Sequence, residues 1–178
     1  WDPAWRDDLA ADRAALESAL RCGDAATWSP EPGDREHRPI NCVTWTEAFA
    51  FCAWDGGRLP TEAEWNFTAA GGDEQRVYPW SRPPSSEDVS RLHAVFGQAG
   101  PEPVGSRSPD GDGRFGHADL AGNTWDWTLD TADPDALLPT EGVDHCSPAG
   151  YPLPCHDCAS LEPRGARVLR GGGFGMPA

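Results

Sequence analysis

The clearest sequence of apolar and polar positions lies between Gly56 and Gly72. Gly56-Gly57 supplies the left-handed conformation in which many helices end. Thr61 and Glu64 have the three-residue spacing of a capping box, in which each side chain accepts a hydrogen bond from the other residue's backbone N–H. We therefore predict a helix from about Glu62 to Ala70, stopped by the glycine pair that follows.

Two further helices are predicted upstream. Leucines recur on one face between about Asp7 and Leu20, which predicts an amphipathic helix over that segment. Thr44 and Glu47 form a second capping box, so another helix is predicted to start after Thr44 and to stop before Gly56. One side of that helix carries residues with the i, i+4, i+7 spacing of a core-facing row, which we interpret as core residues rather than cofactor ligands: Trp45, Phe49 and Cys52.

The rest of the chain is irregular. Residues Tyr78 to Gly116 are rich in Pro, Gly, Ser and Asp and show no helical period, so they are predicted to form loops with short strands such as Pro103–Ser106. Arg167–Leu169 is predicted to be a short strand that enters a glycine turn, and residues from about 133 to 162 a polar surface insertion. The sequence therefore predicts an α+β fold with about three helices, few short strands and much loop.

Length and charge narrow the class of protein. A chain of 178 residues is long enough for one domain with a buried core. Lys plus Arg number 14 and Asp plus Glu 29, a net charge of −15, so binding to nucleic acid or to anionic lipid is not expected. No apolar stretch is long enough to span a membrane. Because the chain does not begin with Met and stops shortly after its last glycine turn, we expect a single incomplete domain over residues 1–178, truncated at both ends.

Six cysteines in this length favour an oxidising compartment, and hence an extracytoplasmic location; reduced core cysteines are the alternative. Cys22 and Cys42 flank one loop and are predicted to be bridged. Three more cysteines lie in the predicted insertion, where a disulfide competes with a zinc site that would include His145 or His156: Cys146, Cys155 and Cys158.

Three segments rich in Trp and Gly occur in a fixed order: Gly56–Phe67, Ala121–Trp127 and Arg167–Phe174. This ordered trio resembles the formylglycine-generating enzyme family, also called the sulfatase-modifying-factor domain, and the resemblance extends from about Arg38 to the C-terminus. It implies an irregular fold related to C-type lectins, with buried tryptophans, and this chain has nine Trp. The family includes copper oxidases that convert a substrate cysteine into formylglycine, iron-dependent sulfoxide synthases, and members with no demonstrated chemistry.

The resemblance also implies a calcium site at Asp119, Gly122, Thr124 and Asp126. Calcium prefers hard oxygen ligands, and this run offers two carboxylates with backbone carbonyls between them. The alternative is that these carboxylates only cap turns. The family's second calcium site has no counterpart in Arg91–Pro103.

Copper chemistry in the family needs two cysteine thiolates, the ligands that Cu(I) prefers. Alignment on the glycine turn places Met176 where the first of these cysteines is expected, and the second would fall beyond Ala178. Related members pair the cysteine that matches Cys52 with one near the domain's C-terminus, so Cys52 is predicted to be a free, buried thiol here. The five histidines are scattered, which does not support the iron-dependent branch.

We therefore expect a formylglycine-generating-enzyme-like domain of a bacterial extracytoplasmic protein, without oxidase activity in this chain. No catalytic residue is assigned, calcium is the expected cofactor, and copper is not expected. The domain would act as a calcium-stabilised binding or structural module for an unidentified protein, peptide or small molecule. The alternative is a metal-dependent oxidase whose catalytic residues lie beyond Ala178.

Overall fold

The computed structural model describes residues 3–131, 159 and 165–177. The chain divides into two compact units, which are treated separately below. The first unit comprises Trp1–Leu9, Trp45–Trp65 and Trp127–Arg170, and the second comprises Ala10–Thr44, Asn66–Asp126 and Gly171–Ala178. The predicted surface insertion lies outside the described residues apart from residue 159, and so do Cys146, Cys155 and Cys158.

The helix predicted at Glu62 forms as α3, Glu62–Ala69. Its capping box is complete, because the Glu64 N–H donates to Thr61 Oγ1 at 3.1 Å and the Thr61 N–H donates to Glu64 Oε2 at 2.8 Å. Arg58 donates to both carboxylate oxygens of Glu64, at 2.6 and 2.7 Å. The start of this helix is therefore fixed by local contacts that the sequence predicts.

The second predicted helix forms as α2, Trp45–Trp54. It ends at Trp54, just before Gly56, which has a φ of +82°, and the Gly57 N–H donates to the carbonyl of Cys52 at 2.8 Å. Trp45 is buried, as predicted for the core-facing row. Phe49 and Cys52 are half-buried, so the row is less enclosed toward the end of the helix than the sequence predicts.

The helix predicted over Asp7–Leu20 is too long. The structure has a 3₁₀-helix η1, Pro3–Asp8, and a separate α-helix α1, Arg13–Ala19. Asp12 causes the break, because its backbone is extended and its carboxylate accepts a hydrogen bond from the Ala15 N–H at 2.8 Å. An acidic residue at this position starts a helix rather than continuing one.

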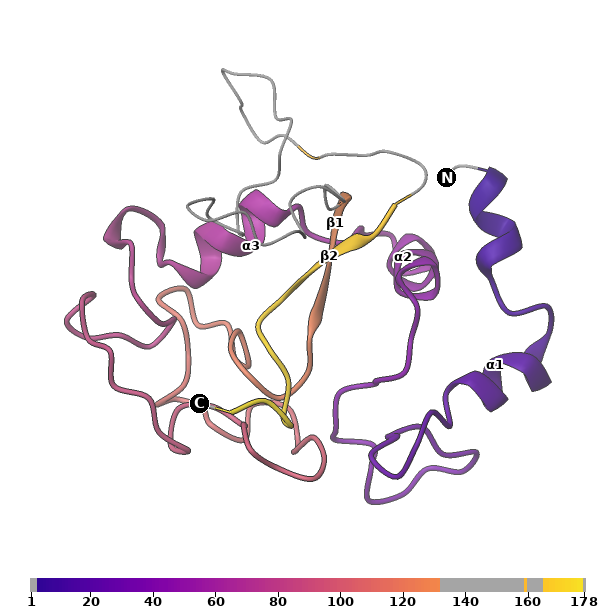
Figure 1. Ribbon diagram of the computed structural model, residues 1–178, viewed down its shortest axis with the longest axis horizontal. Helices are drawn as coiled ribbons and strands as arrows, with labels where there is room; N and C mark the ends of the chain where they lie inside the picture. The colour runs from indigo at the N-terminus through magenta and orange to yellow at the C-terminus, as the bar shows by residue number, and fades with distance from the viewer. Residues whose placement is uncertain (1–2, 132–158, 160–164, 178) are drawn as a thin grey trace. The chain divides into compact units, whose positions relative to one another are not determined.

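Two strands form the sheet of the first unit: β1, Asp126–Thr131, and β2, Arg167–Arg170. They lie side by side in Figure 1. The β2 strand is predicted by the sequence, whereas β1 is not. In β1 the fully buried side chains are the polar Thr128 and Asp130, the opposite of the usual apolar-inside alternation.

Buried polar groups of the first unit have specific partners. The Asp130 carboxylate accepts a hydrogen bond from the Glu62 N–H at 2.7 Å, and Arg170 pairs with the Glu62 carboxylate. The Arg167 guanidinium lies 3.7 Å from the Trp45 ring centroid. Burial lowers the pKa of Arg167, with the Asp130 charge opposing that effect. These contacts tie α2 and the start of α3 to the sheet.

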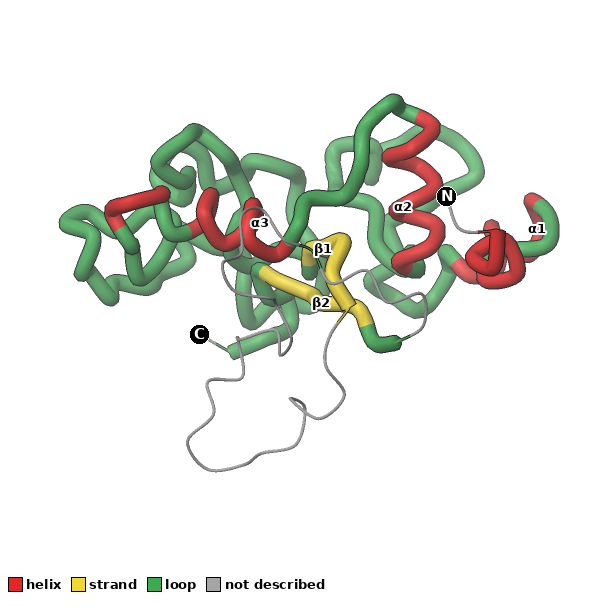
Figure 2. Tube along the Cα trace, turned by 90° about the horizontal axis from the view of Figure 1, so that it is seen from above, coloured by secondary structure: helices red, strands yellow, loops and turns green. Residues whose placement is uncertain are grey.

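Most of the second unit is loop and turn. Loops and turns are green in Figure 2. The short 3₁₀-helix η2, Gly72–Glu74, follows α3, and Val95 forms an isolated parallel bridge with Gly122. The strand predicted at Pro103–Ser106 is wrong: the segment forms a turn, in which the Ser106 N–H donates to the Pro103 carbonyl at 3.1 Å. Gly105 in this turn has a φ of +67°, which a strand does not accommodate.

Candidate functional site

The predicted calcium residues lie around one cavity of the second unit. This cavity has a volume of about 470 Å³, and its lining includes Asp119, Thr124 and Asp126. Gly122 does not line it. The structure therefore brings three of the four predicted residues together.

Local backbone geometry positions these side chains. Asp119, Gly122 and Asn123 have φ values of +55°, +82° and +59°, so the loop curls sharply. Asp119 Oδ2 accepts a hydrogen bond from the Gly105 N–H at 2.8 Å, which fixes one carboxylate oxygen at the cavity. The turn at Gly105 thus serves to hold the first predicted ligand.

Asn123 holds this loop in place, and it is not among the residues that the sequence predicts for the site. Its side chain is 1% exposed, and its Oδ1 accepts from the Glu102 N–H at 3.0 Å. Its own N–H donates to the Val95 carbonyl at 2.9 Å. An Asn that follows a Gly is a signal for left-handed backbone, and that signal identifies this position.

The glycine turn after β2 packs on the same loop. The Gly122 N–H donates to the Gly171 carbonyl and the Phe174 N–H to the Asn123 carbonyl, both at 2.8 Å. Gly173 is buried, and a Cβ added there would lie 3.0 Å from Cδ1 of Trp125. Two motifs about fifty residues apart in the sequence therefore form one continuous structure.

Met176, the residue expected at the copper-cysteine position, lies at the end of this turn. Its carbonyl accepts from the Gly97 N–H at 2.9 Å, and its own N–H donates to the Gly173 carbonyl at 3.0 Å. The residue is 46% exposed. Backbone contacts thus fix its position and leave much of the residue open to solvent.

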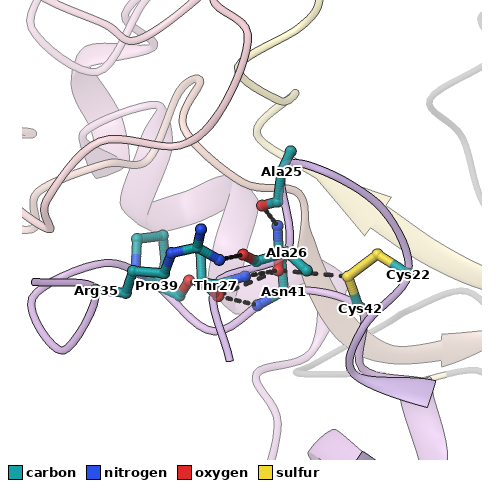
Figure 3. Close-up of a disulfide and its surroundings, with 8 residues drawn as sticks. All are labelled: Cys22, Ala25, Ala26, Thr27, Arg35, Pro39, Asn41 and Cys42. Carbon is teal, nitrogen blue, oxygen red and sulfur yellow. Dashed lines mark hydrogen bonds between the residues drawn. A yellow bond between two sulfur atoms is a disulfide. The ribbon is translucent and has the colours of Figure 1, made fainter. Parts of the chain in front are cut away.

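The described cysteines fall into two states. Cys22 and Cys42 form the predicted disulfide, with Cα atoms 5.8 Å apart (Figure 3). Cys52 is free, as predicted, but half-buried rather than buried. Burial raises the pKa of the Cys52 thiol, and the nearby Asp55 carboxylate raises it further.

The donor set at Asp119 and Asp126 fits calcium in its chemistry, because it offers carboxylate and carbonyl oxygens and no sulfur or imidazole. Among the residues that the structure describes, no three His, Cys, Asp or Glu side chains gather as metal ligands would. The predicted calcium set has only two carboxylates, so that finding does not bear on it.

No helix of the described residues is long and apolar enough to cross a bilayer.

The sequence profile of the sulfatase-modifying factor enzyme 1-like domain matches residues 18–177. This chain therefore belongs to that family, which also contains the formylglycine-generating enzymes similar to it. It is 39% identical over 144 residues to the inactive C-alpha-formylglycine-generating enzyme 2 of Bos taurus, which covers 68% of this chain and 47% of the relative. It is 35% identical over 157 residues to the formylglycine-generating enzyme of Thermomonospora curvata, which covers 79% and 46%. The chain thus spans about half the length of these relatives.

Solved structures show the same fold. PvdO from Pseudomonas aeruginosa superposes with a TM-score of 0.53 at 23% identity, over 79% of this chain and 52% of that one. Treponema denticola variable protein 1 superposes with a TM-score of 0.58 at 20% identity, over 90% and 69%. These likenesses establish a mixed α+β fold with much loop, as the sequence predicts.

Proposed function

We propose that this chain is a formylglycine-generating-enzyme-like domain that does not oxidise cysteine by the two-thiolate copper mechanism. The carrying observation is Met176, which occupies the position that the family resemblance gives to the first copper cysteine. A thioether is neutral and binds Cu(I) more weakly than a thiolate does. One of the two ligands on which the family's oxidation depends is therefore replaced.

The other described cysteines offer no substitute. Cys22 and Cys42 are bonded to each other, and Cys52 is a single half-buried thiol, whereas the family's copper site needs two thiolates. The likeness to the inactive bovine protein supports the same conclusion.

The alternative is a metal-dependent oxidase whose catalytic residues come from sequence outside residues 1–178. The likeness to the Thermomonospora curvata enzyme favours this second function.

A direct assay separates the two. The chain is incubated with a cysteine-containing sulfatase-type peptide, Cu(I) and a reductant, and the peptide is analysed by mass spectrometry. The Thermomonospora curvata relative serves as the positive control. We expect aldehyde only in the control, and copper-dependent turnover by this chain would overturn the argument from Met176.

We further propose that the domain is a calcium-stabilised binding or structural module. The support is the cavity shared by Asp119 and Asp126, together with the oxygen-only donor set. The module's ligand is an unidentified protein, peptide or small molecule.

Calorimetry tests the calcium site. Asp119→Asn and Asp126→Asn each remove one charge at nearly constant volume, and each is expected to weaken calcium binding at least tenfold. Asp110→Asn is the matched control, because Asp110 is exposed and lies outside the cavity lining. Equal affinity of all three variants and the unaltered chain would rule out this site.

We also propose an extracytoplasmic location. The Cys22–Cys42 disulfide supports it, since such bonds persist in oxidising compartments.

A further inference from the structure

A second cavity lies within the loop that the Cys22–Cys42 disulfide closes. It has a volume of about 410 Å³, and every residue that lines it falls between Thr27 and Ile40. A single covalently closed loop of the second unit thus supplies every lining residue of this open pocket, which shares none of them with the cavity at Asp119.

Hydrogen bonds fix the shape of this loop, as Figure 3 shows around Asn41. Asn41 Oδ1 accepts from the Thr27 N–H at 2.9 Å, and Asn41 Nδ2 donates to the Ala25 carbonyl at 2.8 Å. Thr27 Oγ1 donates to the Pro39 carbonyl at 2.9 Å. These bonds and the disulfide hold the two ends of the loop together, so the pocket is preorganised for a ligand.

Two arginines line the pocket without a carboxylate partner. Arg35 Nη1 donates to the Ala26 carbonyl and Arg38 Nη1 to the Pro101 carbonyl, both at 2.6 Å. Neither guanidinium forms an ion pair with any carboxylate of the described chain, although the protein carries a net charge of −15. Carbonyl contacts position each side chain, and both arginines are exposed to solvent.

The rest of the lining includes apolar surface. Trp28 contributes to one wall, and the Arg21 guanidinium lies 5.0 Å from its ring centroid. The other apolar residues of the lining are Pro30, Pro32 and Ile40, and Ile40 is 52% exposed. Glu36 also lines the pocket, so its charged residues are two arginines and one carboxylate beside an aromatic and aliphatic wall.

We propose that this pocket binds a small organic monocarboxylate that carries an aromatic or branched aliphatic group. A guanidinium can donate two parallel hydrogen bonds to the two oxygens of a carboxylate, and the apolar wall matches the hydrocarbon part. A dianionic phosphate is disfavoured relative to a monoanion, because Glu36 lines the pocket and the same loop holds three more carboxylates: Asp24, Glu31 and Asp34. The proposal does not rest on the calcium site or on the oxidase question, although Pro39 of the same loop lines the cavity at Asp119.

Isothermal titration with matched probes tests the proposal on the oxidised chain. N-acetylphenylalanine carries both the carboxylate and the aromatic group, N-acetylphenylalaninamide lacks the charge, and inorganic phosphate lacks the apolar part. We expect the acid to bind at least tenfold more tightly than either comparison probe. Equal affinities for the acid and the amide would overturn the proposal.

Variants locate the binding. Arg35→Gln and Arg38→Gln keep a donor for the backbone carbonyl but lose the charge, so each is expected to weaken binding of the acid about tenfold. Arg35→Lys keeps the positive charge but lacks the paired N–H donors of a guanidinium. It is therefore expected to bind the acid more tightly than Arg35→Gln does and less tightly than the unaltered chain does. The matched control is Arg91→Gln, an exposed arginine that also donates to a backbone carbonyl, that of Gly97. Unchanged affinity in both pocket variants, or an equal loss in the control, would overturn the assignment.

One further probe identifies the source of the carboxylate. N-acetyl-Gly-Gly-Phe has the same terminal group on a peptide. If it binds more tightly than the single amino-acid derivative, the carboxylate is that of a peptide C-terminus; if it does not, the ligand is a free small acid. Circular dichroism of each variant confirms that the comparison is made between folded chains.

Discussion

Single residues with left-handed backbone hold the candidate calcium loop in shape, and Gly122 is the one whose replacement the structure penalises most directly. Its φ is +82°, and an added Cβ would lie 2.5 Å from the Val95 carbonyl oxygen. We predict that Gly122→Ala lowers the free energy of unfolding by more than about 3 kcal/mol, because backbone strain and a clash with main chain add together. Urea unfolding in the presence of EDTA measures the loss without a contribution from metal.

Gly116 provides a control at almost the same backbone angle. Its φ is +81°, and a Cβ added there meets nothing within 4 Å. Gly116→Ala should therefore lower the free energy of unfolding only by the cost of left-handed backbone, about 1–2 kcal/mol. Equal losses in the two variants would mean that the contact with Val95 contributes nothing, and that this loop is less tightly packed than the structure indicates.

At the level of elements, the capping box at the start of α3 makes the stability of the fold depend on pH. Hydrogen bonds from Arg58 and from the Thr61 N–H lower the pKa of Glu64 from 4.5 to about 2. A carboxyl whose pKa is lower in the folded state stabilises the fold above its unfolded pKa, and this contribution is lost as the pH falls from about 4.5 toward 2. Glu64→Gln keeps an acceptor but has no charge to lose. We predict that it costs about 1 kcal/mol at pH 6 and much less near pH 2.5.

The measurement is urea unfolding of both chains across this pH range. Glu17→Gln is the control, because Glu17 pairs with Arg13 in an exposed i, i+4 arrangement on α1. Its removal should cost about 0.5 kcal/mol or less. A stability difference for Glu64→Gln that stays constant from pH 6 to pH 2.5 would contradict the assigned role of its charge.

Elements whose ends depend on neighbouring residues are predictable from the sequence, and elements that depend on distant partners are not. The spacing of Thr61 and Glu64 specifies α3 to within one residue. The β1 strand escapes prediction because its buried face is polar: Asp130 is buried and accepts a hydrogen bond from the Glu62 N–H, which is 68 positions away. An apolar-inside rule places Trp127 and Leu129 in the core instead.

The same distinction applies to the candidate site. Asp119 and Asp126 follow from spacing and family resemblance, whereas the packing of the loop against the Gly171 turn rests on hydrogen bonds between residues about fifty positions apart. Asn123 acts through Val95 and Glu102, neither of which is close to it in sequence. The pocket inside the Cys22–Cys42 loop is a third case, because the sequence predicts the bridge but not the cavity that it encloses.

For the whole molecule, the Cys22–Cys42 bridge restricts the unfolded chain. The two cysteines are 20 positions apart, and closing a loop of that length stabilises a fold by about 3 kcal/mol. We predict that a phosphine reductant lowers the free energy of unfolding by about this amount. The Cys22→Ser/Cys42→Ser double variant is treated with the same reductant. Any change in its free energy of unfolding comes from the remaining cysteines. A reductant effect of equal size in the double variant would mean that another bond accounts for it.

Calcium gives the last prediction, because a ligand that binds only the folded state stabilises it by mass action. At a free concentration of about 100 times the Kd, the gain is about 2.7 kcal/mol. Part of that gain should appear as slower hydrogen exchange at the amides that join the loop to its neighbours, those of Gly122, Asn123 and Phe174. Magnesium should protect them less, because it holds its water shell more firmly and demands a stricter geometry. In Asp126→Asn the calcium effect on these three amides should fall at least tenfold; full protection in that variant would place the bound ion elsewhere.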